Sequence, residues 1–126
     1  MPIKLPLSAN YNSLMNSDVP ISDSIWSATL SATTDTTLAV PLTSDLGGSN
    51  TATVNYLVAR IRHTPLKDVY FAVNGTGAVP AGSSFASTTS ELLDDNVCEY
   101  KIKSGDTLHF YTAATGASVT VAFYWL

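Results

Sequence analysis

The sequence predicts an all-β fold, a single antiparallel β-sandwich of about eight strands. Apolar and polar residues alternate with a period of two in seven segments and more weakly in an eighth, which is typical of strands with one buried face. Clusters of Gly, Asp, Asn, Ser and Pro separate these segments at intervals near a dozen residues. No stretch of ten or more residues shows a helical period. This pattern is typical of an antiparallel sandwich or barrel, and eight strands fit a jelly roll.

The clearest strands lie at the end of the chain, between residues 96 and 126. Three consecutive segments place an alternating apolar set on one side, beginning at Cys98, Leu108 and Val119. Residues 104–106 and 114–117 supply the turns between them. We expect these three strands to form a β-meander, with the last strand closing the sheet and holding the C-terminus in place.

The other strands are expected at residues 25–33, 36–42, 53–63, 69–73 and, weakly, 83–93. Pro41 has no N–H to donate, so the second of these segments either lies at a sheet edge or ends there. The third segment is the longest and has apolar residues on both faces at its start, which indicates a central strand. Residues 74–77, Asn-Gly-Thr-Gly, predict a turn after the fourth.

The first 23 residues differ from the rest of the chain. Pro2, Pro6 and Pro20 interrupt any regular element, yet the segment has an apolar content that a disordered tail has little reason to carry. We therefore divide the chain into an extended N-terminal arm, residues 1–23, and a β-sandwich domain, residues 24–126. We expect the arm to lie on its own domain or on a neighbouring subunit, and the alternative is a loosely ordered terminus. Its interface candidates are Ile3, Leu5, Leu7, Tyr11 and Leu14.

The composition narrows the class of partner. Only 13% of the residues are charged, and Ser and Thr together make up 31 of 126, which suits a hydroxyl-covered β-structure. The net charge of −4 argues against nucleic-acid binding, which needs a basic stripe. No apolar run approaches the ~20 residues of a membrane span, so we expect no membrane partner. The start of the chain does not resemble a signal peptide, which predicts synthesis in the cytoplasm of a host cell.

The sequence contains none of the common catalytic motifs. We find no phosphate-binding loop, no Gly-x-Gly-x-x-Gly, no nucleophile elbow and no His-Glu-x-x-His. His63, His109 and Cys98 are too few and too scattered for a zinc site, and one cysteine allows no internal disulfide. Acidic residues around Asp94 and Asp95 could bind Ca²⁺, although a solvated acidic loop is the better explanation. We expect no enzymatic activity and no cofactor.

Basic residues and tyrosines provide the candidate binding surfaces. Arg60 and Arg62 are two residues apart, so both lie on one face of their strand, and the same holds for Lys101 and Lys103. If the two strands are neighbours, the four cations form a patch that can meet an acidic partner; the alternative is cross-strand pairing with acidic residues such as Glu99. Tyrosines on the outward parity suit an interface, a sugar site or a second apolar layer. The interface candidates of the domain are Tyr56, Arg60, Arg62, Tyr70, Tyr111 and Tyr124.

The order of features after residue 56 adds a resemblance. A strand with two arginines ends in a turn, and a strand at residues 69–73 precedes Asn-Gly at 74–75. Pro-Ala-Gly follows at 80–82, then a strand that ends in Lys-Ser-Gly-Asp at 103–106, and finally Thr-Gly-Ala-Ser-Val-Thr-Val at 115–121. This order resembles small β-sandwich virion proteins of tailed bacteriophages, the capsid decoration or cement proteins. The resemblance implies a jelly-roll-like domain, often trimeric, that clamps neighbouring major capsid proteins from outside and has no catalytic residues.

We therefore expect a structural virion protein on the capsid exterior that binds, and cements or decorates, the lattice of the major capsid protein as a homotrimer. A chain without residues 1–23 should fold but lose capsid binding and trimerisation. One alternative is a carbohydrate- or receptor-binding module of a phage tail fibre, with Tyr70, Tyr111, Trp26 and Asp94 at its site. The other is a different head–tail structural protein.

Overall fold

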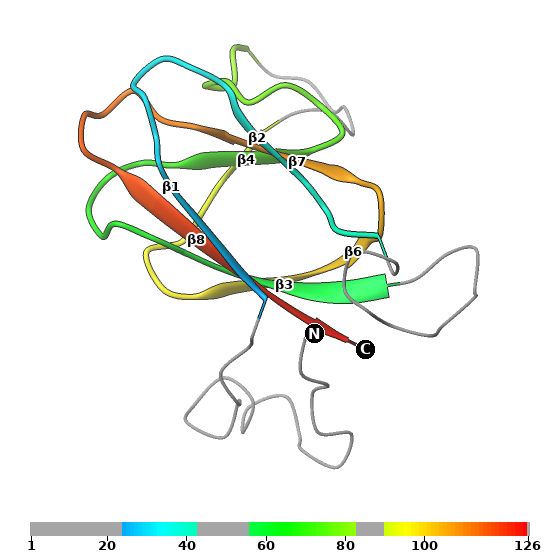
Figure 1. Ribbon diagram of the computed structural model, residues 1–126. Coiled ribbons are helices and arrows are strands. Elements are labelled where there is room, and N and C mark those ends of the chain that lie inside the picture. Colours follow the sequence, from blue (N-terminus) through cyan, green and yellow to red (C-terminus); the bar gives the residue numbers. More distant parts are fainter. Residues whose placement is uncertain (1–23, 43–55, 83–89, 126) are drawn as a thin grey trace.

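The protein is a sandwich of two antiparallel four-stranded sheets (Figure 1). The computed structural model describes residues 24–42, 56–82 and 90–125, which contain eight strands and no helix. Sheet A has the order β1 (Ile25–Thr29), β8 (Ser118–Trp125), β3 (Tyr56–His63), β6 (Cys98–Lys103). Sheet B has the order β2 (Thr36–Ala39), β7 (Thr107–Tyr111), β4 (Tyr70–Val73), β5 (Glu91–Leu92). The predicted all-β sandwich is confirmed. The arm predicted at residues 1–23 lies outside the described residues.

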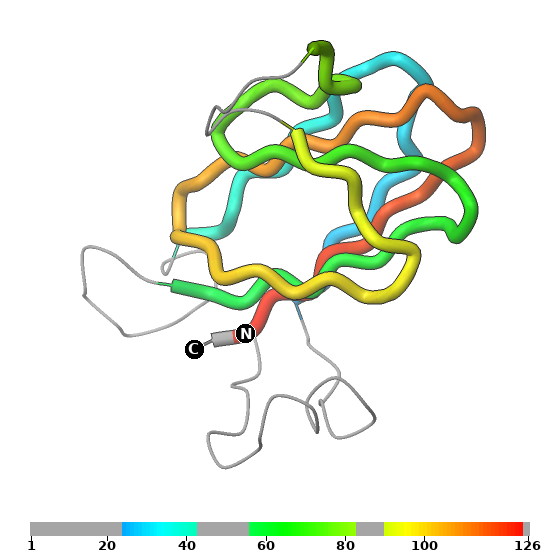
Figure 2. Tube along the Cα trace, turned by 180° about the vertical axis from the view of Figure 1, so that it is seen from behind, coloured from blue at the N-terminus to red at the C-terminus, as the bar shows by residue number. Residues whose placement is uncertain are grey.

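The first strand pairs with the last, and each following strand pairs with the one before its predecessor's partner, down to β4 with β5. Strand β1 pairs with β8, β2 with β7, β3 with β6, and β4 with β5, all of them antiparallel. The chain is thus one long hairpin, closed at β4 and β5, whose successive pairs are divided between the two layers. Further pairing of β3 with β8 and of β4 with β7 completes each sheet. Figure 2 shows from behind how the chain passes from β5 in one layer to β6 in the other.

The predicted C-terminal β-meander is wrong. Strands β6 and β8 lie in sheet A and β7 lies in sheet B, so none of the three pairs with another of them. The turn after β6 changes layers instead of closing a hairpin, because Gly105 donates its N–H to the Val40 carbonyl and Val40 donates to the Asp106 carbonyl. Alternation and turn residues predict where strands begin and end, but a short turn joins strands of different sheets as readily as strands of one sheet.

Several positions expected from the sequence are confirmed. Strand β2 is an edge strand and ends before Pro41, and β3 lies between β8 and β6 inside sheet A. Within the weak segment at residues 83–93 the structure has the two-residue strand β5, while residues 83–89 lie outside the described part. The turn after β4 forms as expected, with Asn74 at a φ of 54°.

The core lies between the two sheets and is centred on aromatic rings. Phe110 on β7 is 0% exposed, and its ring lies 5.9 Å from that of Trp26 and 5.4 Å from that of Phe71. Because Trp26 comes from sheet A and Phe110 from sheet B, the contact between these two rings joins the layers, whereas Phe71 is the neighbour of Phe110 within sheet B. The remaining core is mostly aliphatic and comes from alternate positions of strands and from residues directly beside strand ends: Leu30, Val40, Leu57, Ala59, Ile61, Val69, Leu108, Val119 and Val121.

Candidate interaction surfaces

The outer side of sheet A brings together most of the basic residues. Leu57, Ala59 and Ile61 of β3 point into the core, so the intervening residues of that strand point outward. The register pairs Tyr56 with Lys103, Val58 with Lys101 and Val58 also with Tyr124. We call this surface face A; its outward residues are Ile25, Ser27, Thr29, Tyr56, Val58, Arg60, Arg62, Glu99, Lys101, Lys103, Ser118, Thr120, Ala122 and Tyr124.

Both interpretations of the basic pairs hold in part. The strands that carry them are neighbours, so the four cations share face A. Arg60 is paired with Glu99, with its Nε 3.6 Å from the carboxylate Oε1. Lys101 places its Nζ 4.4 Å from the centre of the Tyr56 ring, a cation–π contact. Within the described part of the chain no carboxylate pairs with Arg62, Lys101 or Lys103, so the face keeps positive charge on a protein of net charge −4.

The middle of face A is more buried than the surface of an open sheet. Tyr124 points outward by register and is 2% exposed, whereas Tyr56 is 40% exposed. The side chains of Arg60 and Glu99 are 15% and 7% exposed. Tyr56, Arg60, Arg62 and Tyr124, four of the predicted interface residues, therefore lie on one face, with Tyr56 and Arg62 accessible on it.

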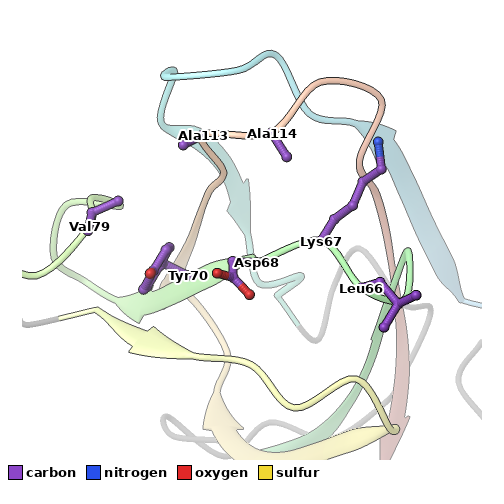
Figure 3. Close-up of a pocket in the computed structure, with 7 residues that line it drawn as sticks. All are labelled: Leu66, Lys67, Asp68, Tyr70, Val79, Ala113 and Ala114. Atoms are coloured by element: carbon purple, nitrogen blue, oxygen red, sulfur yellow. The ribbon is translucent and has the colours of Figure 1, made fainter.

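The other two predicted tyrosines lie on the opposite side of the molecule. Tyr70 and Tyr111 are register partners on the outer face of sheet B, and both are half-buried. Tyr70 forms part of an open hollow of about 300 Å³ (Figure 3). The lining residues are Leu66, Lys67, Asp68, Tyr70, Val79, Ala113 and Ala114. Figure 3 shows Asp68 beside Tyr70 and the Lys67 amine turned away from them; that amine donates a hydrogen bond to the Thr115 carbonyl.

The loop after β4 covers part of sheet B. A Cβ on Gly77 would lie 2.7 Å from the Asp35 Oδ1 and 3.1 Å from the Tyr111 Cβ, so this position has room only for glycine. The Ser90 hydroxyl accepts from the Ala78 N–H and donates to the Thr76 carbonyl, which fixes the loop. The outer side of sheet B is therefore less open than face A.

A second hollow, of about 600 Å³, lies at the end of β3 and contains His63 in its wall. The His63 Nε2 is 2.8 Å from the Asp94 carbonyl oxygen and its Nδ1 is 3.0 Å from the Thr64 carbonyl oxygen. Carbonyl oxygens only accept, so a ring nitrogen that carries hydrogen is the donor in these contacts. The ring joins the end of β3 to the segment that leads into β6, and both strands contribute to face A.

The nucleophilic and acidic groups near β6 are also committed to structure. Burial raises the pKa of the Cys98 thiol, which keeps it protonated and unreactive. Burial, and then the nearby charge of Glu91, raise the pKa of Tyr100 to about 12. His109, on the outer side of sheet B, has its Nδ1 2.9 Å from the Asp35 Oδ2.

The described residues contain neither a metal-ligand cluster nor a membrane-spanning helix. No group of three or more His, Cys, Asp or Glu side chains in residues 24–42, 56–82 and 90–125 is placed to hold a metal ion. No helix long and apolar enough to cross a bilayer occurs in the same ranges.

The predicted sites are thus partly brought together. Lys101 and Lys103 belong to face A beside the predicted residues, and alternation with Cys98, Tyr100 and Ile102 was the signal that placed them there. The sugar site imagined for the tail-fibre alternative does not form as expected, because Trp26 stacks on Phe110 inside the sandwich. The arm candidates Ile3, Leu5, Leu7, Tyr11 and Leu14 lie outside the described residues.

Comparison with models of known protein families, with curated proteins and with solved structures finds no match for this chain. The resemblance to capsid decoration proteins therefore stays a prediction.

Proposed function

We propose that this protein is a structural component of a tailed-phage virion that binds the outer surface of the capsid and cements or decorates the lattice of the major capsid protein. The observation that carries the proposal is the order of the strands. We interpret the wrapped hairpin, with β1 on β8, β2 on β7, β3 on β6 and β4 on β5, as a jelly roll. Eight-stranded jelly rolls recur in viral capsid proteins and in lectins.

Face A supports a protein partner in preference to a small molecule. It is the outer side of a four-stranded sheet, and neither hollow described above opens at its centre. Tyr56 and Arg62 are of the residue types that are enriched at protein interfaces. The unpaired cations favour an acidic partner, because complementary charge speeds encounter and disfavours wrong partners. A cement protein needs this combination of a rigid core and an accessible binding face.

The proposal is tested by co-sedimentation with purified capsids of the phage that encodes the chain. The unaltered protein should pellet with capsids and saturate at a fixed ratio. Lys101→Glu combined with Lys103→Glu should weaken binding on the order of tenfold or more, because two attractive contacts become repulsive. Lys67→Glu reverses one charge away from face A and is the control, compared with each of Lys101→Glu and Lys103→Glu alone. Absence of binding by the unaltered chain contradicts the proposed function, and equal binding by the double variant contradicts the role of face A.

A sugar-binding role is the second candidate, favoured by the hollow beside Tyr70. An aromatic ring next to the Asp68 carboxylate offers a stacking surface and a hydrogen-bond acceptor, the two elements that a sugar ring uses. A glycan array decides this candidate: binding that disappears with Tyr70→Ala supports it, and no binding with or without Ca²⁺ rules it out. The carboxylate is exposed and single, so any affinity there should be weak.

A further inference from the structure

In the middle of face A, the side chain of Tyr124 points outward by its position in the strand but is buried. Tyr124 points away from the core, because Phe123 and Val121 on the same strand point into it. In an open sheet, neighbouring strands at ~4.8 Å shield the flanks of a side chain but leave its tip exposed. Tyr124 is nevertheless buried as deeply as Phe123, although no other described element lies over face A.

The less exposed positions of face A lie in two adjacent rows that cross the sheet. In the first row Ala122, Arg60 and Glu99 are half-buried, and in the second Tyr124 is buried and Val58 is half-buried, whereas Ile25 and Lys101 at the ends of these rows are exposed. The apolar residues of face A lie in or beside these rows, toward the start of β1 and β3 and the end of β8. The opposite end of the face carries Ser118, Thr120 and Thr29, which need no cover. The apolar end of this sheet is therefore the part that requires an occupant.

The connectivity of the chain indicates which segment that is. The first described residue, Ser24, lies at the apolar end, where its carbonyl accepts a hydrogen bond of 3.0 Å from the Phe123 N–H. The 23 residues before it can span up to roughly 75 Å when extended, at ~3.3 Å per residue. The face itself is no longer than β3, whose eight residues span about 26 Å by the same measure. The segment therefore starts beside the face and is long enough to cross it.

The sequence of this segment has apolar side chains that are complementary to the apolar end of face A. Ile3, Leu5 and Leu7 alternate with Lys4 and Pro6. Pro6 disfavours the helical conformation at Leu5, so an extended chain here is favoured, and it would direct its three aliphatic side chains to one side. Three aliphatic side chains on an apolar strip bury area that neither surface can bury alone.

We propose that residues 1–7 of the chain dock on the apolar end of face A of the same molecule. Attachment through residues 8–23 gives the segment a high effective concentration at its own face, which favours it over a segment from another molecule. The docked segment covers Tyr124 and the Arg60–Glu99 pair, and it leaves Arg62, Lys101 and Lys103 outside its footprint. The inference does not rest on the proposed capsid binding, since it concerns only the protein alone.

Hydroxyl-radical footprinting of the full chain tests the docking. Tyr124 should be oxidised as slowly as Phe110. In the variant Ile3→Asp, Leu5→Asp, Leu7→Asp its oxidation should rise several-fold while that of Phe110 stays unchanged. The control Asn10→Asp, Asn12→Asp, Asn16→Asp adds the same charge at polar positions of the segment and should leave Tyr124 protected. Rapid oxidation of Tyr124 in the unaltered chain, or no increase in the aliphatic variant, overturns the proposal.

Disulfide trapping keeps the proposal testable if the aliphatic variant unfolds and exposes Phe110 as well. In a Cys98→Ser background, Leu5→Cys with Val58→Cys should form an intramolecular disulfide that migrates as a monomer in non-reducing electrophoresis. Leu5→Cys with Thr37→Cys, on the outer side of sheet B, should not. Disulfide-linked dimers mean that the segment belongs to a neighbouring molecule, and no disulfide means that it does not reach face A; either result overturns the docking within one molecule.

Discussion

His63 should act as the clamp that fixes β3 against β6, and replacing it should be costly. Its side chain is 1% exposed, and its two ring nitrogens bond the carbonyl oxygens of Asp94 and Thr64. His63→Leu retains a similar volume but removes both ring nitrogens. A buried acceptor that loses its partner costs ~1–3 kcal/mol. Both carbonyls lie close to the surface, so water recovers part of that cost, and we expect a total of about 2–3 kcal/mol.

Thermal unfolding followed by circular dichroism measures this loss. With an unfolding entropy of ~2.1 cal/mol/K per residue, the midpoint should fall by roughly 8–11 °C. His63→Gln retains a side-chain amide donor and should lose about half as much. The neighbouring Arg62→Gln, exposed and without a described hydrogen bond, should change stability by less than ~0.5 kcal/mol. A His63→Leu protein as stable as the Arg62→Gln control would refute the clamp.

Three further predictions concern face A, β6 and the loop over sheet B. Capsid binding by the unaltered chain should weaken steeply as the salt concentration rises. The affinity of the Lys101→Glu, Lys103→Glu variant should depend less on salt. Identical salt dependences of the two affinities would contradict the electrostatic role of face A. In an absorbance titration at alkaline pH, Tyr100 should ionise with a pKa of about 12. Because that value is raised above the ordinary 10, the contribution of Tyr100 to stability should be complete below pH ~10 and fall as the pH rises toward 12; loss of the delayed ionisation in the unaltered protein, with no difference from a Tyr100→Phe variant, would be the contrary result. Gly77→Ala should lower the free energy of unfolding by about 1–3 kcal/mol, measured with denaturant, because the added methyl collides with the Asp35 carboxylate and crowds Tyr111 and Phe110 of β7. An unchanged unfolding midpoint would show that the loop moves to accommodate the methyl group.

The sequence predicted the strands better than the connections between them. Alternation located β3, β6, β7 and β8 because each buries one face, and Pro41 predicted the end of β2 because it cannot donate to a ladder. The meander failed because the turn at residues 104–106 is compatible with a hairpin and with a change of layer. That choice is made by distant residues, here by the backbone of Val40.

The sequence predicted which residues of the candidate site point outward, but not which of them pair with one another or are buried. Spacing by two placed Arg60 with Arg62 and Lys101 with Lys103, but only the register of β3 with β6 shows that Arg60 faces Glu99 while the others do not. Parity placed Tyr124 outward, which the register supports, yet parity says nothing about its burial. The hydrogen bond between His63 and the Asp94 carbonyl joins residues 31 positions apart and had no local signal.

The capsid-facing surface is the central claim, and a cryo-electron microscopy map of capsids saturated with the protein tests it most directly. The account predicts added density on the capsid exterior. In this density the sheet of β1, β8, β3 and β6 faces the lattice, and Lys101 and Lys103 lie opposite acidic residues of the major capsid protein. Density that presents the β2, β7, β4 and β5 sheet to the lattice, or capsids that carry no added density, would contradict it.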